Sequence, residues 1–206
     1  MAQLFTFHPT HPQKRLVRQA ADIVRRGGLI AYPTDSCYAL GCHLGAAPAL
    51  ARLRALRGID ERHHLTLMCR DLSEIAKYAM VSDRNFALLK VPGSYTFILP
   101  ARREVPRRVT RKKTIGVRIP GHPAAHALLA ELDEPMLSST LALPGEAAPL
   151  SDAQEIRERL GRLLDLVIDA GPCDTQPSTV LDLTGDEPQV LRKGKGPLAP
   201  FAVEPV

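Results

Sequence analysis

Apolar positions along the chain recur at two spacings, one typical of helices and one typical of short strands. Over 12–26 they recur every three or four residues, and Gly27 and Gly28 follow directly. This pattern predicts a helix with Pro12 in its first turn and a glycine stop at its end. Further helices are predicted over 47–57, 73–78, 83–90, 123–132 and from a cap at Ser151 or Asp152 to Leu160.

Short apolar runs between these helical segments predict a set of strands. They lie at 29–32, 65–68, 95–99, 114–119, 136–140, 166–168, 179–183 and 189–191. Strands alternate with helices in the first half of the chain, and adjacent strands follow in the second half. The order predicts an α/β fold in which helices pack on a mixed parallel and antiparallel sheet.

The composition is that of a globular protein, and 206 residues suit one large domain over the whole of 1–206. No stretch approaches the roughly 18 apolar residues that span a bilayer. Residues 1–12 lack the layout of a signal peptide. The cysteines are scattered without a Cys-x-x-Cys pair, which disfavours zinc and a disulfide framework. We therefore expect a soluble, cytoplasmic protein with no protein-bound metal and no membrane partner.

The net charge of +5 is concentrated in one segment. Residues 102–113 carry seven basic side chains and one acid, so the segment sums to +6 and the rest of the chain to −1. One interpretation is a solvated connection between two strands. The other is a contact with an RNA phosphate backbone, made by Arg107, Arg108, Arg111, Lys112 and Lys113. No aromatic residue interrupts the run, which argues against base stacking.

The familiar catalytic and phosphate-binding motifs are absent. The chain has no P-loop, no dinucleotide-binding glycine fingerprint and no Gly-x-Ser-x-Gly elbow. His122 and His126 are four apart on a predicted helix, but no third ligand accompanies them, so a metal site is disfavoured. His63 and His64 are interpreted as a polar entry to a strand.

Hydroxyl and arginine side chains instead gather at the ends of predicted strands. Thr34 and Ser36 follow one strand, and Thr114 and Arg118 share a face of another because they are four residues apart. Ser138, Ser139 and Thr140 end a third strand, Ser178 precedes a fourth and Arg192 follows the last. Strand ends are where ligand sites gather, and these side chains suit a phosphate or carboxylate.

Several of these segments resemble the YrdC/YciO family, and in particular its YciO branch. Residues 27–41 read Gly-Gly-Leu-Ile-Ala-Tyr-Pro-Thr-Asp-Ser-Cys-Tyr-Ala-Leu-Gly, which is similar to the opening signature of that family. The likeness continues, in family order, through 92–99, 114–120, 178–180 and 190–194. It therefore covers nearly the whole chain.

The resemblance implies a twisted mixed α/β sheet with a basic concave groove, and a reaction. In threonylcarbamoyl-adenylate synthases, L-threonine, bicarbonate and ATP give threonylcarbamoyl-AMP and pyrophosphate, and the product feeds modification of a tRNA adenosine. Mg²⁺ is expected to assist. By position, the resemblance implies catalytic roles for Arg57 and Arg118, nucleotide binding by Arg57 and Arg192, and substrate binding by Thr34, Ser36, Thr114, Thr140 and Ser178.

The chain departs from the synthase pattern at positions 59, 68 and 142. Synthases carry Lys-x-Arg where this sequence has Arg57-Gly58-Ile59, and Ser-x-Asn where it has Thr140-Leu141-Ala142. A family histidine that helps to hold threonine falls at Met68. Each lost hydrogen bond to a charged group is worth about 1.5–3 kcal/mol, so the losses together predict a weak enzyme.

Three functions therefore remain open at the level of the sequence. The first is a weak threonylcarbamoyl-AMP synthase. The second is a protein that binds duplex RNA or tRNA and keeps the fold without efficient synthase chemistry. The third is a related nucleotide-dependent enzyme with another acyl or carbamoyl acceptor, which the loss of the histidine at Met68 favours.

Overall fold

The computed structural model describes residues 1–61, 63–91, 93–107, 109–110 and 113–201. Within them lie ten strands: β1 (Gln3–Thr6), β2 (Leu29–Tyr32), β3 (Ala39–His43), β4 (Thr66–Met68), β5 (Tyr95–Pro100), β6 (Thr114–Arg118), β7 (Met136–Thr140), β8 (Leu166–Asp169), β9 (Thr179–Asp182) and β10 (Gln189–Arg192). The helices are α1 (Lys14–Arg25), α2 (Ala47–Arg57), α3 (Leu72–Tyr78), α4 (Asp83–Leu89), α5 (Pro123–Leu132), α6 (Ala153–Leu160) and a closing 3-10 turn, η1 (Ala199–Phe201).

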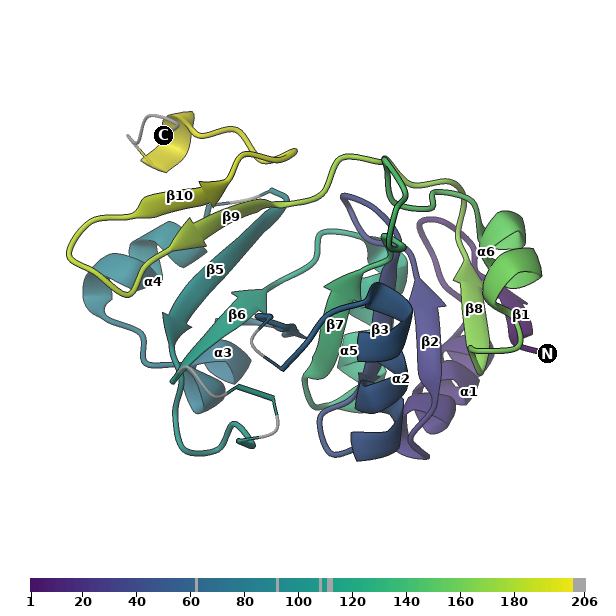
Figure 1. The fold of residues 1–206 in the computed structure, drawn as a ribbon. Coiled ribbons are helices and arrows are strands. Elements are labelled where there is room, and N and C mark those ends of the chain that lie inside the picture. Colours follow the sequence, from purple (N-terminus) through teal and green to yellow (C-terminus); the bar gives the residue numbers. More distant parts are fainter. Residues whose placement is uncertain (62, 92, 108, 111–112, 202–206) are drawn as a thin grey trace.

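All ten strands belong to one sheet, in the order β1-β8-β2-β3-β7-β4-β6-β5-β9-β10. The pairs β1–β8, β2–β8, β4–β6 and β5–β9 are parallel. The other neighbours are antiparallel. The sheet runs from β1 on the right of Figure 1 to β10 on the left, so elements from both halves of the chain alternate across it.

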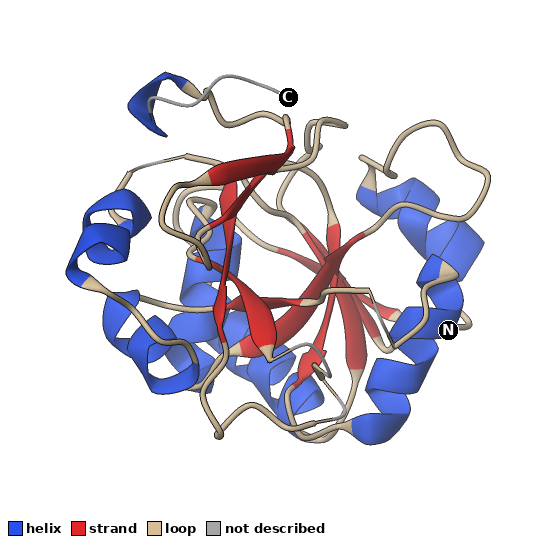
Figure 2. Cartoon of the chain, turned by 60° about the vertical axis from the view of Figure 1, so that its left-hand side comes forward, coloured by secondary structure: helices blue, strands red, loops and turns tan. Residues whose placement is uncertain are grey.

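Helices cover both sides of this twisted sheet, as Figure 2 shows. α1 and α5 pack against each other and bury one apolar cluster, to which Ile30 and Leu166 contribute from the sheet. α2, α3 and α6 bury a second cluster with Leu29 and Val167. Leu29 is the neighbour of Ile30 and Val167 is the neighbour of Leu166, so their side chains point to the opposite face of the sheet. Two cores on opposite faces hold the sheet between them.

The apolar pattern predicts most of these elements correctly, and the mixed α/β fold is confirmed. α2, α5, β2 and β7 have the predicted bounds, and most other boundaries differ by one residue. The first helix begins at Lys14 with Gln13 at its N-cap, so the placement of Pro12 in its first turn is wrong. Asp152 caps α6 by accepting a hydrogen bond from the Glu155 N–H at 2.9 Å.

Two strands are missing from the prediction. β1 has only four residues and pairs with β8, more than 150 positions further on, so no local signal marks it. β3 reads Ala-Leu-Gly-Cys-His, and its alanine and glycine have low strand propensity. Its position between β2 and β7 comes from tertiary pairing.

We also searched the described helices for a segment that could cross a bilayer. Not one of them combines the necessary length with sufficient apolar character.

Candidate functional site

A cavity of about 380 Å³ lies over the middle of the sheet, where seven neighbouring strands and the connections between them meet. Hydroxyl and arginine side chains dominate its wall: Thr34, Ser36, Thr66, Thr96, Ser138, Ser139, Thr140, Ser178, Arg57, Arg118 and Arg192. Apolar side chains and a thiol supply much of the remainder, including Ala39, Met68, Ile98, Val180 and Cys37. The volume is that of a small-molecule site.

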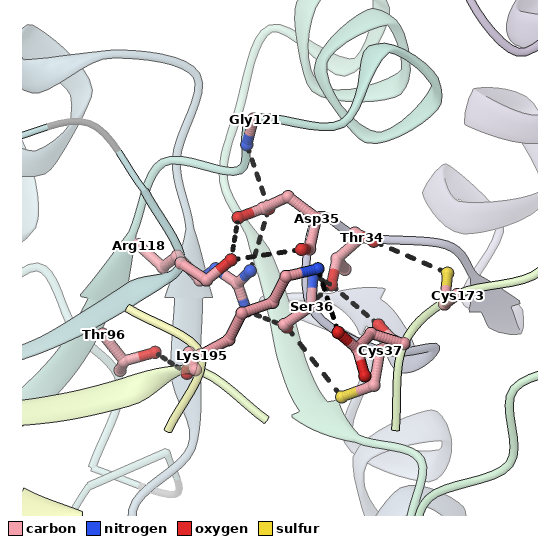
Figure 3. A network of polar contacts seen from close by, with 12 residues as sticks. Thr34, Asp35, Ser36, Cys37, Thr96, Arg118, Gly121, Cys173 and Lys195 are labelled. Carbon is pink, nitrogen blue, oxygen red and sulfur yellow. Dashed lines mark hydrogen bonds and ion pairs between the residues drawn. The ribbon is translucent and has the colours of Figure 1, made fainter. Parts of the chain in front are cut away.

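Arg118 is the most deeply buried of the three arginines that line the cavity. It ends β6, is 7% exposed, and donates from Nη2 to Asp35 Oδ1 at 2.8 Å and from Nη1 to Ser36 Oγ at 3.0 Å. Figure 3 shows the guanidinium pointing toward both residues of the loop after β2. Its Nε is buried and has no hydrogen-bond partner among the described residues. Within the described part of the chain, Arg118 therefore keeps one guanidinium donor, its Nε–H, without a protein acceptor.

Asp35 is held in turn by two further groups. Gly121 N–H donates to its Oδ1 at 3.0 Å, and Ser94 Oγ donates to its Oδ2 at 2.6 Å. Burial raises the pKa of this carboxyl, but Arg118, Ser94 and Gly121 together hold it below its usual value of 3.8. Asp35 is thus ionised at neutral pH, and contacts from Arg118, Ser94 and Gly121 hold its carboxylate beside the Arg118 guanidinium.

Thr34 and Ser36 shape the same loop. Thr34 Oγ1 donates to the Cys37 carbonyl at 2.7 Å and accepts from the Ser36 N–H at 3.2 Å. The Ser36 hydroxyl lies 3.1 Å from Thr34 Oγ1. Burial raises the pKa of the Cys37 thiol, which stays protonated in spite of the nearby Ser36 hydroxyl. The loop therefore offers neutral donors beside the Arg118 cation.

Arg57 enters the cavity from the end of α2. Its Nε donates to Ser139 Oγ at 3.1 Å, and its Nη1 donates to the Ala142 carbonyl. Gly58 follows at φ +60°, a left-handed conformation that suits glycine, and ends the helix at this point. The helix terminus and the end of β7 together place this guanidinium.

Arg192 closes the opposite wall from β10. Its Nε and Nη2 donate to the Ser178 carbonyl at 3.0 and 2.9 Å. The Ser178 hydroxyl lies 2.9 Å from the Thr96 hydroxyl on β5. Burial lowers the pKa of Arg192, and Arg118 acts in the same direction. An anionic ligand between the arginines would relieve that repulsion.

The charged side chains in the described lining of the cavity are positive. No carboxylate is found among the described residues that line the cavity. Arg57 and Arg192 make hydrogen bonds to neutral acceptors, and within the described residues no carboxylate pairs with either. Clustered guanidinium groups without counter-ions favour phosphate or carboxylate groups of a ligand.

The structure thus brings together seven of the residues that the sequence singled out: Thr34, Ser36, Arg57, Arg118, Thr140, Ser178 and Arg192. Thr114 is an exception, because it lies behind His64 and does not line the cavity. Its Oγ1 is 3.0 Å from Nε2 of His64, and His64 rather than Thr114 lines the cavity. His63 lines it as well. The sequence analysis interpreted these two histidines as a polar entry to a strand and did not predict that they line the cavity.

The residues of the basic segment are only partly described. Arg107 and Lys113 are exposed in the connection between β5 and β6, and neither lines the cavity. Arg108, Arg111 and Lys112 lie outside the described residues. The prediction that these five side chains contact RNA therefore stays a prediction.

The paired histidines of the α5 region do not share a helix face. His122 is the N-cap of α5, and its Nδ1 accepts a hydrogen bond from the Ala124 N–H at 3.2 Å. The placement of His122 on the helix with His126 was therefore wrong. No cluster of three or more His, Cys, Asp or Glu side chains suited to a metal ion occurs in the described part of the chain.

Positions 59, 68 and 142, where the sequence departs from the synthase pattern, occupy different surroundings. Ile59 packs against the apolar cluster under α2. Met68 is buried at the end of β4 and lines the cavity beside Arg118, its partner in the parallel pair. Ala142 accepts a hydrogen bond from Arg57 at its carbonyl and donates its N–H to the Thr140 carbonyl at 3.0 Å. None of the three side chains offers a donor to a ligand.

Fold and cavity together define the class: a twisted mixed α/β protein with a cationic, hydroxyl-rich pocket on its sheet. A model of the Sua5/YciO/YrdC domain, described as "Telomere recombination", matches residues 22–194. The chain belongs to this family, as its motifs indicated.

Individual relatives agree with this assignment. YciO of Escherichia coli K12 is 50% identical over 205 residues, which cover 98% of this chain and 100% of that protein. The crystal structure of E. coli YciO matches with a TM-score of 0.94 over 98% of this chain and 100% of that one. A threonylcarbamoyl-AMP synthase of Halorhodospira halophila is 35% identical over 156 residues, 74% of this chain and 81% of that protein. P. abyssi Sua5 complexed with L-threonine matches with 27% identity and a TM-score of 0.87, over 96% of this chain and 59% of that one.

Proposed function

We propose that this protein forms threonylcarbamoyl-AMP and pyrophosphate from L-threonine, bicarbonate and ATP, as a weak synthase. The observation that carries the proposal is the convergence of Arg57, Arg118 and Arg192 on one cavity whose described lining contains no carboxylate. Each substrate and product of this reaction carries a carboxylate, a phosphate or, in bicarbonate, a carbonate anion. A related synthase and a relative complexed with L-threonine support this choice among anionic ligands.

The three arginines lie at different places in the cavity wall, and each position suggests a role. Arg118, fixed by Asp35 and surrounded by Ser36 and Thr34, suits the carboxylate of the amino acid or its carbamate. Arg57 and Arg192 suit the phosphates, where they would stabilise the charge that develops as the carbamate oxygen attacks the α-phosphate. The protein then acts mainly by positioning and by electrostatic stabilisation.

The nucleotide is proposed to enter as its Mg²⁺ complex. Because the described lining supplies hydroxyl oxygens but no carboxylate, the ion would be coordinated by phosphate oxygens and water. The metal thus comes with the substrate, and the protein needs no dedicated site for it.

The low rate follows from the lost donors. Ile59 is an aliphatic side chain packed against the apolar cluster and Ala142 has no side-chain amide, so two donors to the phosphates are missing relative to the synthase pattern. Met68 cannot replace a histidine as a donor to the amino acid. At about 1.5–3 kcal/mol for each lost hydrogen bond to a charged group, the combined effect is several orders of magnitude in rate.

The test is release of pyrophosphate from ATP by the purified protein, measured with and without threonine and bicarbonate. We expect release that requires both, and Arg118→Ala should reduce it by at least about 10²-fold because the anionic ligand would lose a cationic partner. Arg84→Ala, an exposed arginine on α4, is the matched control. Equal activity in Arg118→Ala and the control would contradict the role of the cavity.

Binding of duplex RNA is the second candidate, favoured by one observation. Arg102, Arg103, Arg107 and Lys113 are all exposed in the connection from β5 to β6, so a cationic surface is accessible there. Clustered cations of this kind bind nucleic acid with an affinity that falls steeply as salt rises. Substitution of Arg107 and Arg108 by glutamine should weaken duplex RNA binding and reduce its salt dependence. Unchanged RNA affinity in that variant would exclude the segment as an RNA contact.

A further inference from the structure

Two histidines at the rim of the cavity stand out as groups that exchange protons near neutral pH. The other ionisable side chains of the described lining are three arginines and Cys37, whose thiol has a raised pKa. Hydroxyl groups do not accept protons at this pH. Within the described wall, His63 and His64 are therefore the candidates for a base.

The two rings differ in what they already contact. His64 Nε2 is engaged with Thr114 Oγ1 at 3.0 Å, which fixes this ring against the start of β6. The imidazole nitrogens of His63 make no hydrogen bond within the described residues. Its backbone is anchored instead, because the His63 N–H donates to the Asp60 carboxylate at 3.2 Å. His63 thus has a fixed position and an available ring.

The charges around His63 favour its neutral form. Desolvation lowers its pKa below 6.5, and Arg57 from the end of α2 lowers it further. His64 beside it and Arg192 on β10 act in the same direction, and only Asp60 opposes them. Since His63 is also an exposed residue, a proton that it gains can pass to solvent.

We propose that His63 is the general base that removes a proton from the ammonium group of the amino acid substrate. This inference rests on the proposed function, because only an amine acceptor requires such a step. His64 serves as a positioning residue that holds the segment before β4 against Thr114. The pair occupies the rim of a pocket in which Met68 stands at the position of the family histidine.

The proton balance of the reaction shows why a base is needed. Threonine enters as an ammonium ion, which gives one proton to His63 and becomes an amine. The amine nitrogen forms a bond to the carbon of bicarbonate, and hydroxide leaves with the second nitrogen proton as water, which gives the carbamate. A carbamate oxygen then attacks the α-phosphate, and the bond to the β-phosphate breaks with release of pyrophosphate. One proton in total passes to His63 and on to solvent.

The test is the pH dependence of kcat/KM for threonine, measured by pyrophosphate release. In the wild type, neutral His63 deprotonates the bound ammonium, so kcat/KM should rise with pH and level off once the pH exceeds the lowered pKa of His63. In His63→Ala, only threonine that has already lost its proton reacts. Its kcat/KM should continue to rise about tenfold per pH unit into the alkaline range, starting about 10²-fold below wild type at pH 7.

Chemical rescue and a control separate a base from a structural role. Added imidazole should restore activity to His63→Ala and bring back the plateau, whereas His126→Ala, at an exposed histidine of α5, should match the wild type throughout. If His63→Ala keeps the plateau of the wild type, or shows no rescue by imidazole, the assignment of the base is wrong while the synthase stands. If the wild type itself releases no pyrophosphate in response to threonine and bicarbonate, both the proposed function and the base are overturned.

Discussion

The ion pair between Asp35 and Arg118 makes a prediction that depends on the structure alone. Both side chains are enclosed, with 20% of the Asp35 side chain and 8% of the Arg118 side chain exposed, and their charged atoms lie 2.8 Å apart. Asp35→Asn removes the charge and keeps the shape. Removal of one partner from a buried pair costs about 3–5 kcal/mol, because the other charge stays buried without compensation. The asparagine amide would also place an N–H group opposite Ser94 Oγ, which in the wild type donates a hydrogen bond to Asp35 Oδ2.

We therefore expect Asp35→Asn to lower the free energy of unfolding by about 3 kcal/mol at pH 7. The difference should depend on pH with a definite sign. The pKa of Asp35 is depressed in the folded state, so its contribution is complete above the unfolded value near 3.8 and is lost as pH falls through the folded value. The difference between wild type and variant should thus begin to shrink as pH falls below about 3.8, and it should vanish only below the lower pKa of Asp35 in the folded protein.

Denaturant unfolding followed by circular dichroism, at several pH values between neutral and acid, measures both quantities. Asp186→Asn, an exposed carboxylate between β9 and β10, serves as the control and should change stability by less than about 0.5 kcal/mol. A double-mutant cycle with Arg118→Met should give a coupling energy of at least about 1.5 kcal/mol. A loss below about 1 kcal/mol at pH 7, or one that does not change with pH, would refute the account of a buried, mutually compensated pair.

Two further predictions concern Arg57 and the departures near it. Gly58→Ala should lower the melting temperature by about 2–6 °C, because the φ of +60° strains alanine and the new methyl group would meet Pro144 Cγ at 2.8 Å. Gly145→Ala is the control in the same thermal scan. Gly145 has a φ of +80° and no atom within 4 Å of the added methyl group, so this variant measures the backbone strain without the clash. Ile59→Arg combined with Ala142→Asn should raise pyrophosphate release by about tenfold or more, since each residue restores a phosphate-side donor; unchanged release in a folded protein would show that these losses do not limit the rate.

The sequence predicts the helices and most strands because their apolar periodicity is local. What it misses depends on contacts between distant segments. β1 is short, β3 carries residues of weak strand propensity, and both are defined by pairing with β8, β2 and β7. Periodicity carries no information about such partners, so these strands could not be predicted from the pattern alone.

The same limit applies to the site. Hydroxyl and arginine side chains at strand ends are visible in the sequence, and Arg118 and Ser178 do lie in one cavity. The partnership of Asp35 with Gly121 and Ser94 is not visible, because it joins three loops. His63 and His64 reach the cavity because β4 pairs in parallel with β6, which places the segment before β4 beside Thr114. Their role depends on this register, which no local motif records.

Transfer of label from isotopically labelled bicarbonate into a nucleotide would reveal the proposed reaction itself. Purified protein is incubated with ATP, Mg²⁺, labelled bicarbonate and threonine, and the nucleotides are separated and analysed by mass spectrometry. We expect labelled threonylcarbamoyl-AMP, a mixed anhydride, that forms only when threonine is present and is reduced by at least about 10²-fold with Arg118→Ala. A folded wild-type protein that leaves all label in bicarbonate would contradict the proposed function.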